Sequence, residues 1–253
     1  MPVKDILIMH EKGMEALVAH AADAVRDVLS YFPQYQHLFQ IKNMGNWMSE
    51  NAHIYKNGEF LLKPYESVEW YLSRAKEAAE KEGRWSFNNK QLNASQIVAD
   101  LSADKRRKNG WHILMTHHDL YGKNEKGQLL NFCFGLSREN AFSVVSTNRF
   151  VDKNNRLHLE NFKTLVQHEF GHILGLTVPR RTNTYEQLGL HCLNNHCVMN
   201  QQMFGNLAEM TEARLTRKRA GLPPICPNCI EQGRKNLSTL YAHSVLNRPF
   251  SRD

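Results

Sequence analysis

Two kinds of hydrophobic spacing mark the first part of the chain. Residues 4–9 form a short apolar run that predicts a buried strand, whereas residues 14–31 repeat apolar side chains at helical spacing until Pro33. Weaker signals favour a strand at 38–41 and a hairpin that turns at the Asn-Gly pair 57–58. The pattern therefore opens as a strand, a helix and further strands.

Two helices and then several strands are predicted downstream. Residues 66–82 are amphipathic and are followed by Gly83, and a second helix runs from its cap Asn93 to about residue 108. Apolar runs then predict buried strands at 111–116, 129–136 and 142–147. This order is typical of an α/β or α+β fold in which helices cover a sheet.

A longer helix is predicted next, capped by Asn154 or Asn155 and ended by Gly175. The chain after Gly175 reads mostly as helix and loop and contains four of the five cysteines. We therefore expect a mixed sheet with helices above a smaller lower subdomain.

The domain boundaries follow from the same pattern. We place residues 1–83 in an N-terminal strand and helix region of the same domain. Residues 84–253 would form the main domain, with an upper part that ends at Gly175 and a lower part at 176–253.

Composition and charge are those of an ordinary globular protein. Hydrophobic residues make up 42% of the 253 residues and charged residues 23%, so the chain can bury a core. It opens without the apolar run of a signal peptide and has no apolar stretch long enough to cross a membrane, which predicts a cytoplasmic protein. The net charge of +7 comes from short, scattered basic clusters without interleaved aromatic residues, which argues against nucleic-acid binding.

The predicted long helix carries the strongest chemical signal. His168 and His172 lie four residues apart, so both imidazoles would project from one helix face towards a single metal ion, with Glu169 beside them. Neutral imidazoles leave a zinc ion its charge, and zinc can then lower the pKa of a bound water to about 7. Glu169 could take the proton of that water. Gly175 would end the helix and let the chain return with a third ligand.

Four cysteines form two close pairs after this helix. Without a secretory signal, thiolates held by a metal ion are a better interpretation than disulfides. Four thiolates leave no position for water, so such a zinc site would be structural. The four are Cys192, Cys197, Cys226 and Cys229. Cys133 lies in an apolar strand and is interpreted as a small buried hydrophobic residue.

The order of these motifs resembles a known family. His191 and Cys192 are followed by Cys197, then Met199, and later by the Cys-Pro-Asn-Cys segment 226–229. This arrangement resembles that of archaemetzincins, metzincin-clan peptidases that carry an added four-cysteine zinc site. The segments 131–136 and 141–150 also look like strands of that family.

The resemblance covers residues 84–240 and has definite implications. It implies a metzincin-like fold and a zinc metallopeptidase that acts on peptides or proteins. It also implies two zinc ions per chain, one catalytic and one structural. Met199 would lie beneath the catalytic zinc and pack against its ligands without binding the ion.

The sequence identifies the third ligand of the catalytic zinc less directly than the first two. Three residues past Gly175, where metzincins carry this ligand, the chain has Val178 and an inserted loop. The resemblance implies His191 instead. Glu186 and His196 are alternatives, and Glu186 would give a centre of two histidines and one carboxylate.

The mechanism implied by the resemblance uses few residues. The ligands of the catalytic zinc would be His168, His172 and His191. Glu169 would act as general base towards the zinc-bound water and then pass the proton to the leaving amine. Substrate would lie extended along an edge strand at 130–136, where Gly135 would allow close approach.

A different class of function stays open. The chain could be a zinc-stabilised binding or regulatory protein whose site is intact but covered by the loop 177–190. A further polar group, formed by His117, His118 and Asp119, lies at the end of a predicted strand. Its spacing does not predict shared ligation, so we interpret these three residues as structural or surface residues.

Overall fold

The computed structural model describes most of the chain. The described residues are 4–45, 53–56, 59–62, 67–103, 110–123, 127–139, 141–151, 157–179, 181–186, 189–200 and 207–246. Within them no helix is long and apolar enough to cross a membrane. The predicted turn at 57–58 and the predicted caps Asn154 and Asn155 lie outside these ranges.

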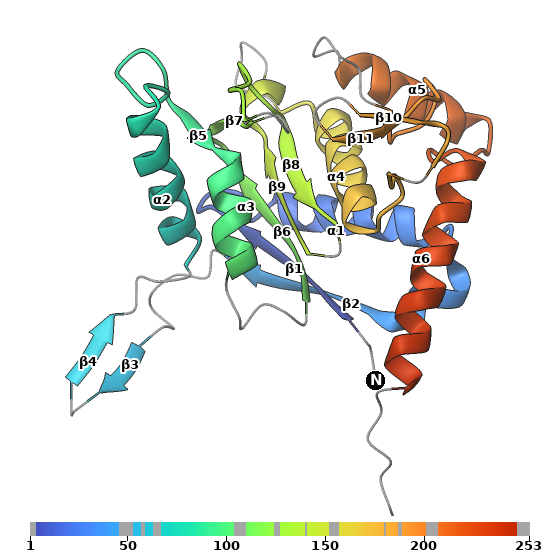
Figure 1. Cartoon of the computed structure of the whole chain (residues 1–253), viewed down its shortest axis with the longest axis horizontal. Coiled ribbons are helices and arrows are strands. Elements are labelled where there is room, and N and C mark those ends of the chain that lie inside the picture. The colour runs from blue at the N-terminus through green and yellow to red at the C-terminus, as the bar shows by residue number, and fades with distance from the viewer. Residues whose placement is uncertain are drawn as a thin grey trace, which may run out of the picture.

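A five-stranded sheet forms the centre of the fold (Figure 1). The strand order is β2-β1-β6-β9-β8; four of these strands are parallel, and β8 pairs antiparallel with β9 at one edge. Every residue of β6 and β9 is buried, as expected for strands covered on both faces. The bounds are β1 Lys4–His10, β2 Phe39–Gly45, β6 Gly110–Thr116, β8 Gly135–Arg138 and β9 Phe142–Ser146.

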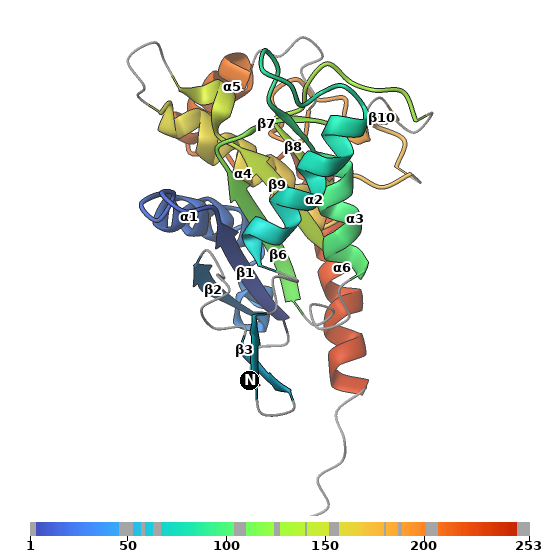
Figure 2. The same ribbon diagram turned by 90° about the vertical axis from the view of Figure 1, so that its left-hand side faces the viewer.

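Helices cover both faces of this sheet. In the side view of Figure 2, α1 and α4 lie on one face and α2 and α3 on the other. Ile113 and Met115 pack in the core beneath α1 and α4, whereas Leu114 packs beneath α2 and α3, because consecutive strand residues point to opposite faces. The helices are α1 Leu17–Leu29, α2 Val68–Lys81, α3 Ala94–Ala103, α4 Leu159–Ile173, α5 Leu207–Arg219 and α6 Pro227–Leu246.

Smaller elements surround this centre. In the described part of the chain, two of them are 3₁₀ helices, Pro33–Leu38 and Asn148–Phe150. The others are three two-stranded pairs: antiparallel β3 His53–Lys56 with β4 Glu59–Leu62, parallel β5 Gln91–Asn93 with β7 Asp119–Tyr121, and antiparallel β10 Thr184–Glu186 with β11 Leu190–Cys192. The β3 and β4 pairing confirms the predicted hairpin.

Most predicted elements are confirmed, including the mixed sheet and the smaller region that contains the cysteines. The Oδ1 of Asn93 accepts from the backbone N–H of Gln96, which confirms the predicted cap of α3. One buried cluster joins the first and last parts of the described chain, because it runs from Ile6 on β1 to Leu237 on α6. The division of the chain at residues 84 and 176 stays a prediction.

Two expectations were wrong, and one hairpin was missed. The edge strand begins at Gly135 rather than at 129, because the residues before it bridge towards β7, as in the hydrogen bond from the N–H of Cys133 to the carbonyl of Leu120. Helix α4 begins after His158, whose side chain makes no capping bond. The β10 and β11 hairpin was not predicted, because strands of three residues are too short to show an alternating pattern.

Helix α4 ends at a tightly packed glycine. Gly175 has a φ of 64°, the left-handed conformation that favours glycine. The side-chain amide of Asn236 on α6 donates to the carbonyls of Leu174, at 2.9 Å, and Gly175, at 2.7 Å. Helix α6 is therefore bound to the end of α4.

We expect Gly175→Ala to destabilise the protein more than Gly83→Ala. Gly175 and Gly83 have positive φ angles of 64° and 69°, so an alanine at either position suffers backbone strain of about 1–2 kcal/mol. A Cβ at Gly175 would also lie 2.5 Å from the Nδ2 of Asn236, whereas a Cβ at Gly83 meets nothing within 4 Å. Displacing Asn236 should add about 1–3 kcal/mol. Urea unfolding of both variants measures the difference, and equal losses would contradict the packing argument.

Candidate functional site

Three histidines from two elements converge. Helix α4 provides His168 and His172, and β11 provides His191; one ring nitrogen of each lies within 4.8 Å of the other two. The Nε2 atoms of His168 and His172 are 3.1 Å apart. This is close to the edge of about 3.4 Å expected for a tetrahedral site with metal–nitrogen distances of about 2.0–2.1 Å. The three side chains fit one metal ion.

The outer nitrogen of each ring has its own partner. The Nδ1 atoms pair as follows: His168 with the carbonyl of Val198 at 2.7 Å, His172 with the hydroxyl of Thr177 at 3.3 Å, and His191 with the carbonyl of Gly189 at 3.0 Å. A carbonyl can only accept, so His168 and His191 carry a proton on Nδ1 when they are neutral. Their Nε2 atoms are then free of protons and can bind a metal ion.

Burial keeps the two helix histidines neutral. It lowers the pKa of His168, although the bond to Val198 opposes this shift. It lowers the pKa of His172 well below its ordinary value, and the neighbouring His168 and His191 lower it further. Neutral imidazole is the form that binds metal ions.

Glu169 follows His168 on α4 and lies against the edge strand β8. Burial raises the pKa of its carboxyl, and a hydrogen bond from the Ser137 hydroxyl opposes this rise; the resulting pKa is about 7. The same hydroxyl lies 3.1 Å from the backbone carbonyl of Glu169. A Cβ at Gly135 would lie 2.6 Å from the Oε1 of Glu169. Glycine at this position therefore allows the strand to approach the carboxylate.

Met199 packs against α4 at Gly171. A Cβ at Gly171, which lies between His168 and His172 in the sequence, would be 2.2 Å from the Sδ of Met199, so this position also requires glycine. Met199 is fully buried, and its carbonyl accepts from the N–H of Cys192 at 2.8 Å. The segment around Met199 thus contacts both α4 and β11.

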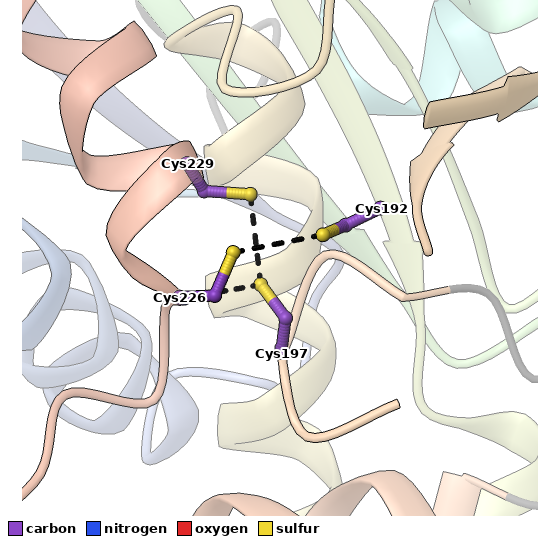
Figure 3. A group of neighbouring side chains, drawn as sticks. All are labelled: Cys192, Cys197, Cys226 and Cys229. Atoms are coloured by element: carbon purple, nitrogen blue, oxygen red, sulfur yellow. Dashed lines mark hydrogen bonds between the residues drawn. The ribbon is translucent and has the colours of Figure 1, made fainter. Parts of the chain in front are cut away.

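Four cysteines form a second cluster (Figure 3). The Sγ atoms of Cys192 and Cys226 are 3.6 Å apart, as are those of Cys197 and Cys229. All four are buried, and none forms a disulfide. The spacing is close to the edge of about 3.8 Å expected for a tetrahedral site with metal–sulfur distances of about 2.3 Å. A second metal ion fits this cluster.

Arg181, in the inserted loop, contacts the cysteine cluster directly. Its guanidinium donates to the Sγ of Cys229 at 3.1 Å and to the Sγ of Cys192 at 3.6 Å. It also donates to the carbonyl of Leu176, just after α4, and to the Oδ1 of Asn183 at 2.6 Å. One cation therefore joins the end of α4, the inserted loop and the sulfur cluster.

The two alternative third ligands are placed differently. His196 is exposed and does not join the three histidines. The backbone of Glu186 pairs with Leu190 across the β10 and β11 hairpin, whereas its side chain lies outside the described part of the chain. Within the described part, His191 completes the cluster.

The polar group His117, His118 and Asp119 separates in the structure. Asp119 forms a two-pronged ion pair with Arg149, with both contacts at 2.7 Å. The two histidines instead contact Glu11, which follows β1. No local spacing in the sequence links Glu11, Ser137 or Arg181 to their partners, so the contacts of these three residues were not predicted.

Comparison with known proteins adds to this geometry. No family model matches the chain. An archaemetzincin from Thermococcus kodakarensis is 33% identical over 133 residues, which are 50% of this chain and 56% of that protein, so the match spans about half the length of each. Over this half, the chain is homologous to an archaemetzincin. The crystal structure of an archaemetzincin from Methanopyrus kandleri shares its fold, with a TM-score of 0.55 and 21% identity over 93% of this chain and 96% of that one.

We expect Arg181→Met to release metal from the cysteine cluster about 10-fold faster or more, because the hydrogen bonds to two sulfurs and a neutralising charge are lost. Arg181→Lys, which keeps the charge but not the two-pronged geometry, should give an intermediate rate. Transfer of metal to a coloured chelator measures both rates. Arg26→Met, an exposed change on α1, is the control, and a wild-type release rate in Arg181→Met would contradict the role of the contact.

Proposed function

We propose that this protein is a zinc-dependent metallopeptidase. The observation that carries the proposal is the position of Glu169, a buried carboxylate that follows His168 on α4 and lies against an edge strand, on the helix that carries two of three convergent imidazoles. The outer nitrogens of the three rings are paired with other groups, so this carboxylate is not needed to orient a ligand. The sequence likeness to an archaemetzincin supports this assignment.

The proposed ligands of the catalytic zinc are His168, His172 and His191. A zinc ion held there supplies Lewis-acid activation of water and of the scissile carbonyl. Three protein ligands leave a fourth position open, which is typical of catalytic zinc sites. The carbonyls of Val198 and Gly189 and the hydroxyl of Thr177 orient the three rings.

Glu169 is the proposed general base. It follows a ligand on α4 but is turned towards β8, where Ser137 donates to its carboxylate. In this position it can accept a proton from the attacking water and later deliver it to the leaving amine. The hydroxyl of Ser137 orients the carboxylate during both transfers.

Substrate is proposed to bind along β8. Within the described residues this strand pairs with β9 on one side only, so its other edge offers backbone groups to an extended peptide. Gly135 and Ser137 bring this edge next to Glu169. The scissile bond of a peptide or protein substrate would therefore lie near the general base.

The cysteine cluster is proposed to hold a second, structural zinc. Four thiolates complete a tetrahedral zinc site and leave no position for water. The ligands are Cys192, Cys197, Cys226 and Cys229. Met199, which contacts α4 at Gly171, is proposed to support the catalytic ligands without binding the metal.

We expect Glu169→Gln to abolish most hydrolysis while the protein keeps both zinc ions. The amide is nearly isosteric but cannot accept the proton, so the rate should fall by about 10²–10⁴-fold. Cleavage of a mixed peptide library and metal analysis of the same sample measure the two effects.

Glu77→Gln on the surface of α2 is the matched control and should leave the rate unchanged. Undiminished cleavage by Glu169→Gln would reject the general-base assignment. If the wild-type protein with both zinc ions cleaves no peptide, the alternative of a zinc-stabilised binding protein replaces the proposed activity.

We expect His191→Ala to weaken the binding of one zinc ion and to remove activity, because two imidazoles alone make a poor zinc site. His196→Ala is the matched control: it lies five residues away, is exposed and should change neither property. Glu186→Ala tests the remaining alternative. Loss of catalytic zinc in Glu186→Ala, with retention in His191→Ala, would move the ligand to Glu186.

A further inference from the structure

We propose that Glu11, His117 and His118 form a third metal site, which takes a divalent transition-metal ion. The Oε1 of Glu11 lies 3.1 Å from the Nε2 of His118, and the Oε2 of Glu11 lies 3.2 Å from the Nδ1 of His117. One potential ligand atom of each residue lies within 4.8 Å of the other two. None of the three residues belongs to the histidine or cysteine clusters.

The sheet brings these residues together. Strands β1 and β6 are parallel neighbours, with His10 opposite Met115, so the residues that follow both strands lie side by side. The N–H of Glu11 donates to the carbonyl of Met115 at 3.0 Å, which continues the pairing by one residue. Beyond Thr116 the chain bends, so His117 and His118 no longer point to opposite faces as they would within a strand.

The carboxylate of Glu11 is held in place by groups that are not ligands. Its Oε2 accepts from the hydroxyl of Thr116 at 2.7 Å and from the N–H of His117 at 3.2 Å. Only 14% of its side chain is exposed. Carboxylates and imidazoles that bind metals are oriented by such hydrogen bonds.

The two histidines are also fixed by neighbouring groups. The carbonyl of His118 accepts from the hydroxyl of Ser146 at 2.6 Å, and the carbonyl of His117 accepts from the side-chain amide of Asn148 at 3.1 Å. The ring of His118 packs edge-on near Trp85, with centroids 5.6 Å apart. The two histidines are therefore ordered by contacts from two other segments, residues 146–148 and Trp85.

The donor set decides the class of ion. Two imidazoles and one carboxylate suit zinc, nickel, copper or iron, whereas magnesium and calcium prefer all-oxygen sites. The side chain of His117 is 55% exposed, which leaves room for water molecules to complete the coordination. Three protein ligands in a half-open site predict weaker binding than in the two buried clusters.

The experiment counts zinc ions on the protein with the other two sites already filled. Native mass spectrometry during a zinc titration should show a third ion that binds more weakly. Glu11→Gln and His118→Asn should each weaken this third ion by at least about 10-fold and leave the first two in place. His158→Asn, which removes an exposed histidine outside the group, is the control and should bind the third ion as the wild type does.

A further variant, at His117, distinguishes loss of the metal site from loss of the fold. His117 is the most exposed of the three residues, so His117→Asn should fold as the wild type does by circular dichroism and still lose affinity for the third ion. The proposal is overturned if no third ion binds at submillimolar zinc. It is equally overturned if the folded variants bind a third ion as tightly as the wild type, which would indicate adventitious binding elsewhere. Neither result depends on peptidase activity.

Discussion

Both buried clusters depend on two consecutive residues of one strand. Side chains of neighbouring residues in a strand point to opposite faces, so β11 directs His191 to helix α4 and Cys192 to helix α6. The backbone of Cys192 is held on both sides, because its N–H donates to the carbonyl of Met199 and its carbonyl accepts from the side chain of Asn200 at 2.7 Å. Any shift of this strand displaces a ligand of each cluster. The fold therefore couples the proposed structural metal to the proposed catalytic one.

Close approach to helix α4 is the second constraint. Three glycines allow it: Gly135 for the edge strand, Gly171 for Met199 and Gly175 for Asn236 of α6. At each of them a Cβ would lie 2.6 Å or less from a neighbouring side chain. The absence of a side chain at these three positions therefore allows the neighbouring segments to pack closely against the helix. The edge strand β8, the segment around Met199 and helix α6 are thereby packed against one helix.

The three clusters of potential ligands arise in different ways. In the histidine cluster, two ligands come from helical spacing and one from a distant strand. The cysteine cluster joins the β11 segment to the start of α6, and Arg181 places a positive charge against its sulfurs. The group around Glu11 forms because two parallel strands end together. The first two are buried, whereas the third is partly open to solvent, and this difference in burial sets the order of their expected affinities.

The sequence by itself determined those features that depend on local spacing. Apolar periodicity predicted helices α1 to α4 and the central strands, and the spacing of His168 and His172 placed both on one face of α4, because residues four apart in a helix are neighbours. The two close pairs of cysteines indicated a second metal site, and the resemblance to archaemetzincins pointed to His191. Only the tertiary structure decided which distant residues meet: Ser137 with Glu169, Arg181 with the cysteines, and Glu11 with His117 and His118. Such contacts depend on strand order and on how closely helices and strands pack, and neither leaves a pattern within a short stretch of sequence.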